Sequence, residues 1–128
     1  MTYKKQLGKS GEEHCIQNLK EQGYEVLHKN FYSPYGEIDI IAKDGHHLVF
    51  IEVKTRTKET VDQAKYSITY SKQKKITKTA MYFLQDFQDS DIREYRFDVI
   101  ILKKENEHIE VNHFKDAFPP AEVGDFFA

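Results

Sequence analysis

Hydrophobic and polar residues alternate most regularly between Gly36 and Arg56. Two β-forming runs, Glu37 to Lys43 and Leu48 to Thr55, flank the pair Asp44-Gly45. An Asp-Gly pair between β-branched segments is typical of a tight hairpin turn. The pattern therefore predicts a β-hairpin in this part of the chain.

Two registers fit this hairpin. With Asp44-Gly45 as the loop, Glu52 lies diagonal to Asp39, whereas a loop at Gly45-His46 places Glu52 directly opposite Asp39, with Cβ atoms about 5 Å apart instead of roughly 7 Å. Side chains alternate along a strand, so the pattern predicts one core face and one face that gathers charge. The core face contains Ile38, Ile40, Val49, Ile51 and Val53, and the charged face contains Glu37, Asp39, Phe50, Glu52 and Lys54.

The remaining periodic segments predict further helices and strands on both sides of the hairpin. Ser10 and Glu13 fit a capping box at the start of a helix, although a start nearer Tyr3 stays open. In chain order the patterns predict a helix from Ser10 to about Gln22, a strand from Tyr24 to His28, a connection from Asn30 to Tyr35, the hairpin, a helix from Ser71 to about Gln88, a strand from Tyr95 to Lys103 and an edge strand from Ile109 to Phe114. This order indicates an α/β domain with a mixed central β-sheet flanked by helices.

Length and charge limit the class of protein. A chain of 128 residues fits one domain, which we place at residues 1–116, followed by an apolar tail at residues 117–128. The tail contains Phe118, Phe126 and Phe127, so we expect it to dock on the domain or on a second subunit. A formal net charge of -2 excludes a globally basic nucleic-acid binder, and any affinity for DNA must come from a local patch.

Several other classes are disfavoured by the composition. No apolar run approaches the ~20 residues of a membrane span, and the first residues lack the apolar core of a signal peptide, so we expect a cytoplasmic protein without membrane contact. Cys15 is the single cysteine, which leaves no intramolecular disulfide. The six histidines show no ligand spacing, and we interpret them as structural or surface residues.

The charged face of the hairpin carries the candidate chemistry. Asp39 and Glu52 repel each other across the strand pair unless a cation neutralises them, and a hard divalent cation would do so. Lys54 reaches the same space, where an ammonium group can orient an attacking water. Taken alone, these residues favour the solvated face of an ordinary antiparallel sheet over a metal site.

The strings Gly-Glu-Ile-Asp-Ile-Ile-Ala and Val-Phe-Ile-Glu-Val-Lys-Thr-Arg resemble the YraN family of small bacterial predicted endonucleases. That family is similar to the restriction-endonuclease-like, PD-(D/E)xK superfamily and, in layout, to archaeal Holliday-junction resolvases. The resemblance covers nearly the whole chain, including Gly11-Glu12, the lysine-rich segment from Lys72 and Arg96-Phe97-Asp98-Val99. It implies a restriction-endonuclease-like fold and a metal-dependent nuclease.

The resemblance also implies roles for individual residues. Asp39 and Glu52, with the Val53 carbonyl, would hold Mg²⁺ or Mn²⁺, while Lys54 would be the catalytic lysine and Glu12 an auxiliary carboxylate. Without the resemblance, Glu12 would be an ordinary acid in a first helical turn. Glu37 lies on the same face as Asp39, and we expect it to shape the edge of the site or to hold a second metal or a water.

Four further residues are candidates for contact with the nucleic-acid backbone. Arg56 and Lys58 follow the Glu-x-Lys strand, and Lys58 fits a solvated connector equally well. Lys72 and Gln73 lie in the first turn of the expected second helix, where free backbone amides favour phosphate.

The function predicted from all this is hydrolysis of phosphodiester bonds in DNA, including branched or otherwise structured DNA. The runner-up substrate is RNA, and the alternative from another class is a catalytically silent nucleic-acid-binding or scaffold protein on the same fold. The likeness to resolvases makes a homodimer reasonable. Asp98 lies within a β-forming run, and it fits a buried partner for a basic side chain better than a site residue.

Overall fold

The computed structural model describes residues 2–56 and 68–124, with side chains from residue 11 onward. The elements in chain order are α1 (Thr2–Glu21), β1 (Glu25–Ser33), β2 (Gly36–Asp44), β3 (His47–Arg56), α3 (Tyr70–Leu84), β4 (Glu94–Glu105) and β5 (His108–Phe114). This is the predicted order of helix, strand, hairpin, helix, strand and strand. Between β3 and α3 the polar sequence predicts a loop that holds one helical turn at residues 61–66, and that turn lies outside the described residues.

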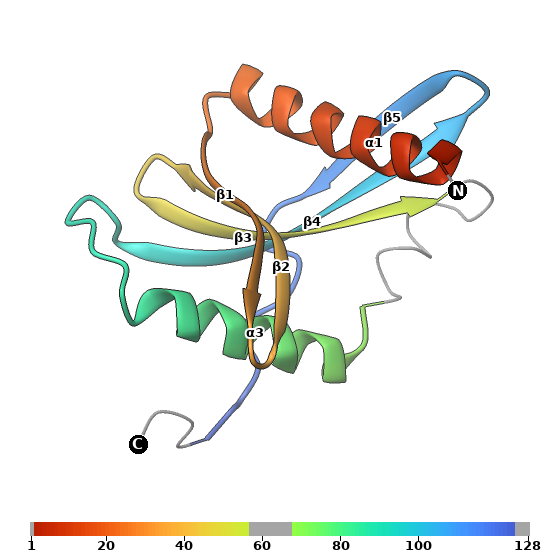
Figure 1. The fold of residues 1–128 in the computed structure, drawn as a ribbon. Helices are drawn as coiled ribbons and strands as arrows, with labels where there is room; N and C mark the ends of the chain where they lie inside the picture. The colour runs from red at the N-terminus through yellow and green to blue at the C-terminus, as the bar shows by residue number, and fades with distance from the viewer. Residues whose placement is uncertain (1, 57–67, 125–128) are drawn as a thin grey trace.

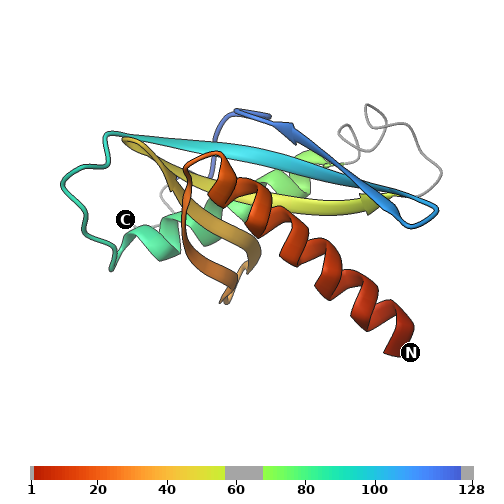
Figure 2. The same ribbon diagram turned by 90° about the horizontal axis from the view of Figure 1, so that it is seen from above.

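The strands form one mixed sheet in the order β1-β2-β3-β4-β5 (Figure 1). β3 and β4 pair in parallel, because the connection through α3 crosses the sheet, and the other neighbours pair antiparallel. Helix α1 lies on one face and α3 on the other, which Figure 2 shows from above. The predicted fold class is thus confirmed, and the arrangement is consistent with a restriction-endonuclease-like fold.

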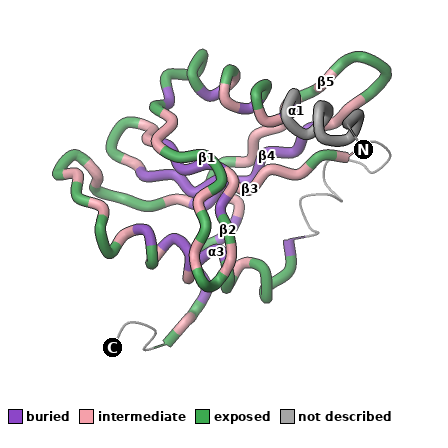
Figure 3. Tube along the Cα trace, in the orientation of Figure 1, coloured by how far each residue is buried: buried purple, intermediate pink, exposed green. Residues whose placement is uncertain are grey.

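Each face of the sheet has its own core cluster, and the buried stretches of Figure 3 follow the central strands. The cluster under α1 contains Cys15 and Leu19 packed on Ile40 and Ile51. The cluster under α3 joins residues of β2, β3, β4, α3 and the C-terminal segment, among them Ile38, Phe50, Ile76, Phe83, Phe97 and Val99.

The prediction of one core face and one charged face is therefore wrong over most of the hairpin. Phe50 is buried beneath α3, and the charged residues of the predicted face lie beyond the last β2–β3 ladder pair, at Glu37, Asp39, Glu52 and Lys54. Ile38 also belongs to the α3 cluster instead of sharing a face with Ile40. The β1–β2 ladder contains a register shift, and Asn30 beside it has a φ of 51°, so strict alternation fails where these strands twist.

Helix α1 begins at Thr2, so the predicted capping box at Ser10 is wrong. Close packing between α1 and β4 explains why Gly11 occurs inside this helix. A Cβ atom at Gly11 would lie 2.9 Å from Leu102 Cδ1, which means that the missing side chain lets α1 approach β4 closely. The glycine serves packing and does not end the helix.

The hairpin takes the second of the two predicted registers. Asp44 pairs with His47 and Ile40 with Ile51, which corresponds to a loop at Gly45-His46. Gly45 has a φ of 61°, a conformation that glycine adopts without strain. The expected connection at residues 30–35 is largely strand, because β1 continues to Ser33.

The sequence predicts Ser71 as the N-cap of the second helix, but the N-cap of α3 lies two residues earlier. The hydroxyl of Thr69, not of Ser71, accepts a hydrogen bond from the Lys72 backbone N–H at 3.2 Å and caps the helix. The helix ends at Leu84, before the predicted end. The hydrophobic pattern continues to Phe87 because Phe87 packs on the same core cluster from the following loop.

Asp98 is fully buried and lies among basic partners, as the sequence suggested. Its carboxylate accepts hydrogen bonds from Arg96 Nε at 2.9 Å and from His113 Nε2 at 2.7 Å, as well as from the Asp116 backbone N–H at 2.9 Å. Burial alone would raise the pKa of Asp98, but the hydrogen bonds from His113 and Arg96 hold it below its ordinary value. Asp98 thus stabilises the junction of β4, β5 and the C-terminal segment.

The C-terminal segment packs against both β4 and α3. Phe118 stacks on Phe97 with ring centroids 5.2 Å apart, and the backbone N–H of Ala121 donates to Thr77 Oγ1 at 3.0 Å. The boundary at residue 117 stays a prediction. In the described part of the chain, neither helix is long and apolar enough to cross a membrane.

Candidate active site

The candidate site lies where β2 and β3 separate. Their ladder ends at the pair of Ile40 and Ile51. Beyond it, the Asp39 carboxylate accepts a hydrogen bond from the Val53 backbone N–H at 2.8 Å. The side chain of Asp39 thus satisfies a backbone donor at the point where the ladder stops, which holds the acid in place.

Asp39 and Glu52 are both partly buried, and the pKa of each carboxyl group is raised. Burial raises the pKa of Glu52 to about 7, with the charge of Asp39 adding to the effect and Lys72 and Lys54 opposing it. The pKa of Asp39 is also raised, chiefly by burial, although the hydrogen bond from Val53 acts in the opposite direction. The two carboxylates therefore form a site that favours a cation or a proton.

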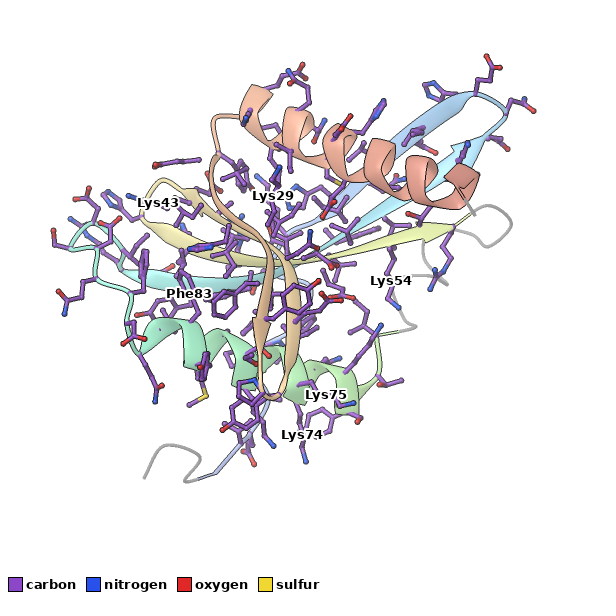
Figure 4. All side chains as sticks on the ribbon, in the orientation of Figure 1. Lys29, Lys43, Lys54, Lys74, Lys75 and Phe83 are labelled. Atoms are coloured by element: carbon purple, nitrogen blue, oxygen red, sulfur yellow. The ribbon has the colours of Figure 1, made fainter. Side chains whose placement is uncertain are left out.

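Two lysines come from different elements to the same place. Lys72 Nζ in the first turn of α3 lies 3.7 Å from Glu52 Oε1. Lys54 extends from β3 on the side of the sheet that α3 covers, as Figure 4 shows. Burial lowers the pKa of Lys54, and the neighbouring ammonium of Lys72 lowers it further. The Lys54 ammonium is consequently more acidic than an exposed lysine.

Helix α1 contributes Glu12 from the other face of the sheet. Glu12, Asp39, Val53, Thr55 and Leu102 line an open hollow of about 170 Å³. Glu12 is among the charges that raise the pKa of Asp39. A larger hollow of about 440 Å³ lies between α1 and β5, but neither Asp39 nor Glu12 lines it, so we place the site at the smaller hollow.

The ligand atoms available at the site can be compared with those that a divalent metal ion requires. Within residues 2–56 and 68–124, no three His, Cys, Asp or Glu side chains are grouped to hold a metal ion. Two carboxylates and the Val53 carbonyl remain as donors. This set fits Mg²⁺, which commonly takes one or two carboxylates and completes its shell with water and phosphate oxygens, and two repelling carboxylates gain from a cation between them.

The other predicted residues surround this centre. Glu37 is exposed on β2, and its charge raises the pKa of both Asp39 and Glu52. Arg56 lies at the end of β3, close enough to lower the pKa of Lys54. The Gln73 amide donates to the Ile68 carbonyl at 3.2 Å and so fixes the start of α3. Lys58 lies outside the described residues.

Comparison with known proteins gives one family. The model of "Uncharacterised protein family UPF0102" matches residues 11–102. The chain belongs to the UPF0102 family. It is 44% identical over 117 residues to a UPF0102 protein of Caldicellulosiruptor saccharolyticus, covering 90% of this chain and 98% of the relative. It is also 46% identical over 108 residues to a UPF0102 protein of Thermodesulfovibrio yellowstonii, covering 82% and 93%.

A UPF0102 protein of Acinetobacter baumannii is 46% identical over 100 residues, covering 78% of this chain and 75% of the relative. The region matched to UPF0102 includes Glu12, the hairpin with its two carboxylates and the start of α3. The family indicated by the sequence resemblance is thereby confirmed, and the names of these relatives state no activity. The roles of the site residues stay predictions.

Sequence reasoning missed one residue at the edge of this site. Tyr32 pairs across the β1–β2 ladder with Glu37, because β1 continues through residues that the sequence assigned to a connection. The pair Ser33-Pro34 made that stretch appear as a connection. The alternation of Phe31 and Ser33 around Tyr32 was the available signal for a strand.

Proposed function

We propose that this protein is a metal-dependent nuclease that hydrolyses phosphodiester bonds in DNA, with the restriction-endonuclease-like site built from Asp39, Glu52 and Lys54. The observation that carries the proposal is the meeting of two partly buried carboxylates with two lysines at the end of β3. Neighbouring carboxylates whose pKa values are raised by burial are suited to hold a divalent cation, and ammonium groups beside them are suited to an anionic substrate.

The position of each residue indicates its proposed role. Asp39, Glu52 and the Val53 carbonyl would hold Mg²⁺ or Mn²⁺, which when bound polarises a phosphoryl oxygen and lowers the pKa of its water. The Asp39 side chain is oriented by the Val53 N–H, so its second oxygen can face the hollow. Glu12 adds negative charge from α1 and assists in retaining the cation.

Lys54 and Lys72 act on the substrate side. An ammonium group at Lys54 orients the attacking water and stabilises the charge that develops on the phosphate. Lys72 lies beside Glu52 at the start of α3, where helix amides and its own charge can contact a backbone phosphate. Arg56 adds a third cation near Lys54. These cations supply the local positive patch that an overall charge of -2 requires for DNA binding.

Cleavage of labelled DNA tests the proposal. Single-stranded, duplex, flap and four-way-junction DNAs, and a structured RNA, are incubated with the wild-type protein and Mg²⁺ or Mn²⁺. The Glu52→Gln and Lys54→Ala variants are run in parallel, with Glu110→Gln on β5 as the control for loss of an exposed acid. We expect cleavage by the wild type and by Glu110→Gln, and at least about a hundredfold less by the other two.

The outcomes separate the candidate functions. Equal cleavage by the wild type and Glu52→Gln would overturn the assignment of the site. Cleavage of RNA alone would replace the substrate class and keep the site. Binding of nucleic acid without turnover on any substrate would favour the catalytically silent scaffold instead.

A further inference from the structure

Tyr32 is an exposed aromatic side chain at the edge of the candidate site. It is 70% exposed, more than any other large hydrophobic or aromatic side chain in the described part of the chain. On the sheet it pairs with Glu37, which lies two residues before Asp39 on β2. The charge of Glu37 raises the pKa of the phenol, with smaller contributions from desolvation, from a hydrogen bond to Glu37 and from the charges of Asp39 and Glu12. The ring is therefore close enough to the site to respond to its charges.

The turn that joins β1 and β2 is anchored on α3, which fixes the position of Tyr32. Ser33 Oγ lies 2.9 Å from Thr79 Oγ1, and the same hydroxyl donates to the Gly36 carbonyl at 3.2 Å. A Cβ atom on Gly36 would lie 3.6 Å from Lys75 Cβ, so the turn backbone rests directly on the helix. Figure 1 shows this hairpin crossing the sheet toward α3. The ring is thus held on a rigid support.

Helix α3 carries cations beside the site and beside the turn that joins β1 and β2. Lys72 is about half exposed beside Glu52, and Lys75 is exposed next to the turn. Figure 4 shows Lys74 and Lys75 on the first half of the helix, near the tip of the hairpin. A basic surface that follows the backbone, combined with an exposed aromatic ring, is the arrangement by which proteins bind single-stranded nucleic acid.

We propose that Tyr32 stacks on an unpaired base next to the phosphate held at the Asp39 and Glu52 site, with the backbone of that strand passing Lys72 and Lys75. In a duplex each base is already stacked between its neighbours and presents only its edge. The substrate class is therefore DNA with a single-stranded segment at the cut, such as a flap, a gap or an opened branch. This inference rests on the proposed function for the position of the phosphate.

A fluorescent base tests the stacking directly. A DNA containing 2-aminopurine in a single-stranded flap is titrated with protein in the presence of Ca²⁺, so that binding is observed without Mg²⁺-dependent turnover. The wild type should quench the fluorophore, because an aromatic ring against its face restores stacking. Tyr32→Ala should bind the flap roughly 5- to 100-fold more weakly and lose the quenching, and Tyr32→Phe should retain both.

Two controls exclude a loss of fold or of general affinity. Tyr95 is 56% exposed at the start of β4, paired with Leu48 and away from the site, so Tyr95→Ala should behave like the wild type. Affinity for a fully paired duplex should change less than twofold in Tyr32→Ala. Unchanged flap affinity in Tyr32→Ala, or an equal loss for flap and duplex, would overturn the proposal.

Parallel cleavage assays keep the two proposals separate. Quenching that depends on Tyr32, in a protein that cleaves no substrate, would support the stacking site and overturn the nuclease. Cleavage of duplex and flap at equal rates, unaffected by Tyr32→Ala, would keep the nuclease and overturn the stacking site.

Discussion

The carboxylate of Asp39 accepts a hydrogen bond from the backbone N–H of Val53, at 2.8 Å, one strand away. The bond connects β2 to β3 just past their last ladder pair, Ile40 and Ile51. Asp39 is therefore both a member of the candidate site and a structural bridge, and these two roles respond differently to substitution.

Comparison of Asp39→Ala with Asp39→Asn separates the two roles. Alanine leaves the Val53 N–H without its acceptor, whereas the asparagine oxygen can replace the carboxylate. We expect Asp39→Ala to have a free energy of unfolding about 1–3 kcal/mol below that of Asp39→Asn. Both variants should lose nuclease activity. Urea unfolding without divalent ions measures the difference, and equal stabilities would show that the hydrogen bond contributes nothing.

Glu52 predicts a pH dependence of stability in the metal-free protein. Its pKa is raised from 4.5 to about 7, so the folded state holds the proton more tightly than the unfolded state. The stabilisation by that proton is complete below about pH 4.5 and is lost as the pH rises toward 7, by up to about 3 kcal/mol. Glu52→Gln should be the more stable protein at pH 8 and should lose its advantage near pH 4.

Urea unfolding at a series of pH values in EDTA measures this difference. Glu110→Gln, which removes an exposed acid, should follow the wild type throughout. A pH-independent gap between Glu52→Gln and the wild type would contradict titration of Glu52 as its cause.

Divalent cations should stabilise the fold through the same carboxylates. A ligand that binds only the folded state raises stability by RT ln(1 + [L]/Kd), about 2.7 kcal/mol at a hundredfold excess over Kd. The melting temperature of the wild type should therefore rise with Mn²⁺ or Mg²⁺. The Asp39→Asn, Glu52→Gln double variant should show no such rise, and an equal rise in both proteins would place the cation elsewhere.

Neutralisation of Asp98 should greatly lower the free energy of unfolding. The Asp98→Asn variant removes the buried charge that Arg96 and His113 contact, leaving Arg96 with Asp44 alone, and removal of one member of a buried pair typically costs 3–5 kcal/mol. Because the pKa of Asp98 is lowered in the fold, its contribution is present above the ordinary aspartate pKa and is lost as the pH falls through the folded value. Chemical unfolding at pH 7 checks this.

Asp86 supplies the matched control for that experiment, because it is an exposed aspartate after α3. The Asp86→Asn variant should change the free energy of unfolding by less than about 0.5 kcal/mol. Similar stabilities for the two variants would contradict a structural role for Asp98.

The local signals in the sequence predicted much of the fold. The hairpin, the helix that contains Ile76 and Phe83 and the strand around Asp98 each follow from short-range periodicity, and each is present. The start of α1 was left open between Ser10 and Tyr3, because Gly8 and Gly11 weaken the helical pattern, and the structure shows the earlier start. Only the contact with Leu102 shows that Gly11 serves close packing.

The candidate site was predicted less completely than the fold. The sequence left two hairpin registers open. Only the surrounding sheet selects the register in which the ladder ends at Ile40 and Ile51, next to Asp39. The contact of Lys72 with Glu52 joins residues twenty positions apart on a strand and a helix. Their meeting depends on the crossover through α3, which no short-range pattern contains.

By itself, the sequence determined the order of the elements, the carboxylates and lysine on one strand pair, and the family. The tertiary structure decided that both faces of the sheet are covered, that Asp39 bonds to Val53 and that Tyr32 lies beside Glu37. The physical reason is the distance along the chain over which each effect acts. Propensity and periodicity act over a few residues, whereas burial, pKa shifts and strand register arise from contacts between segments far apart along the chain.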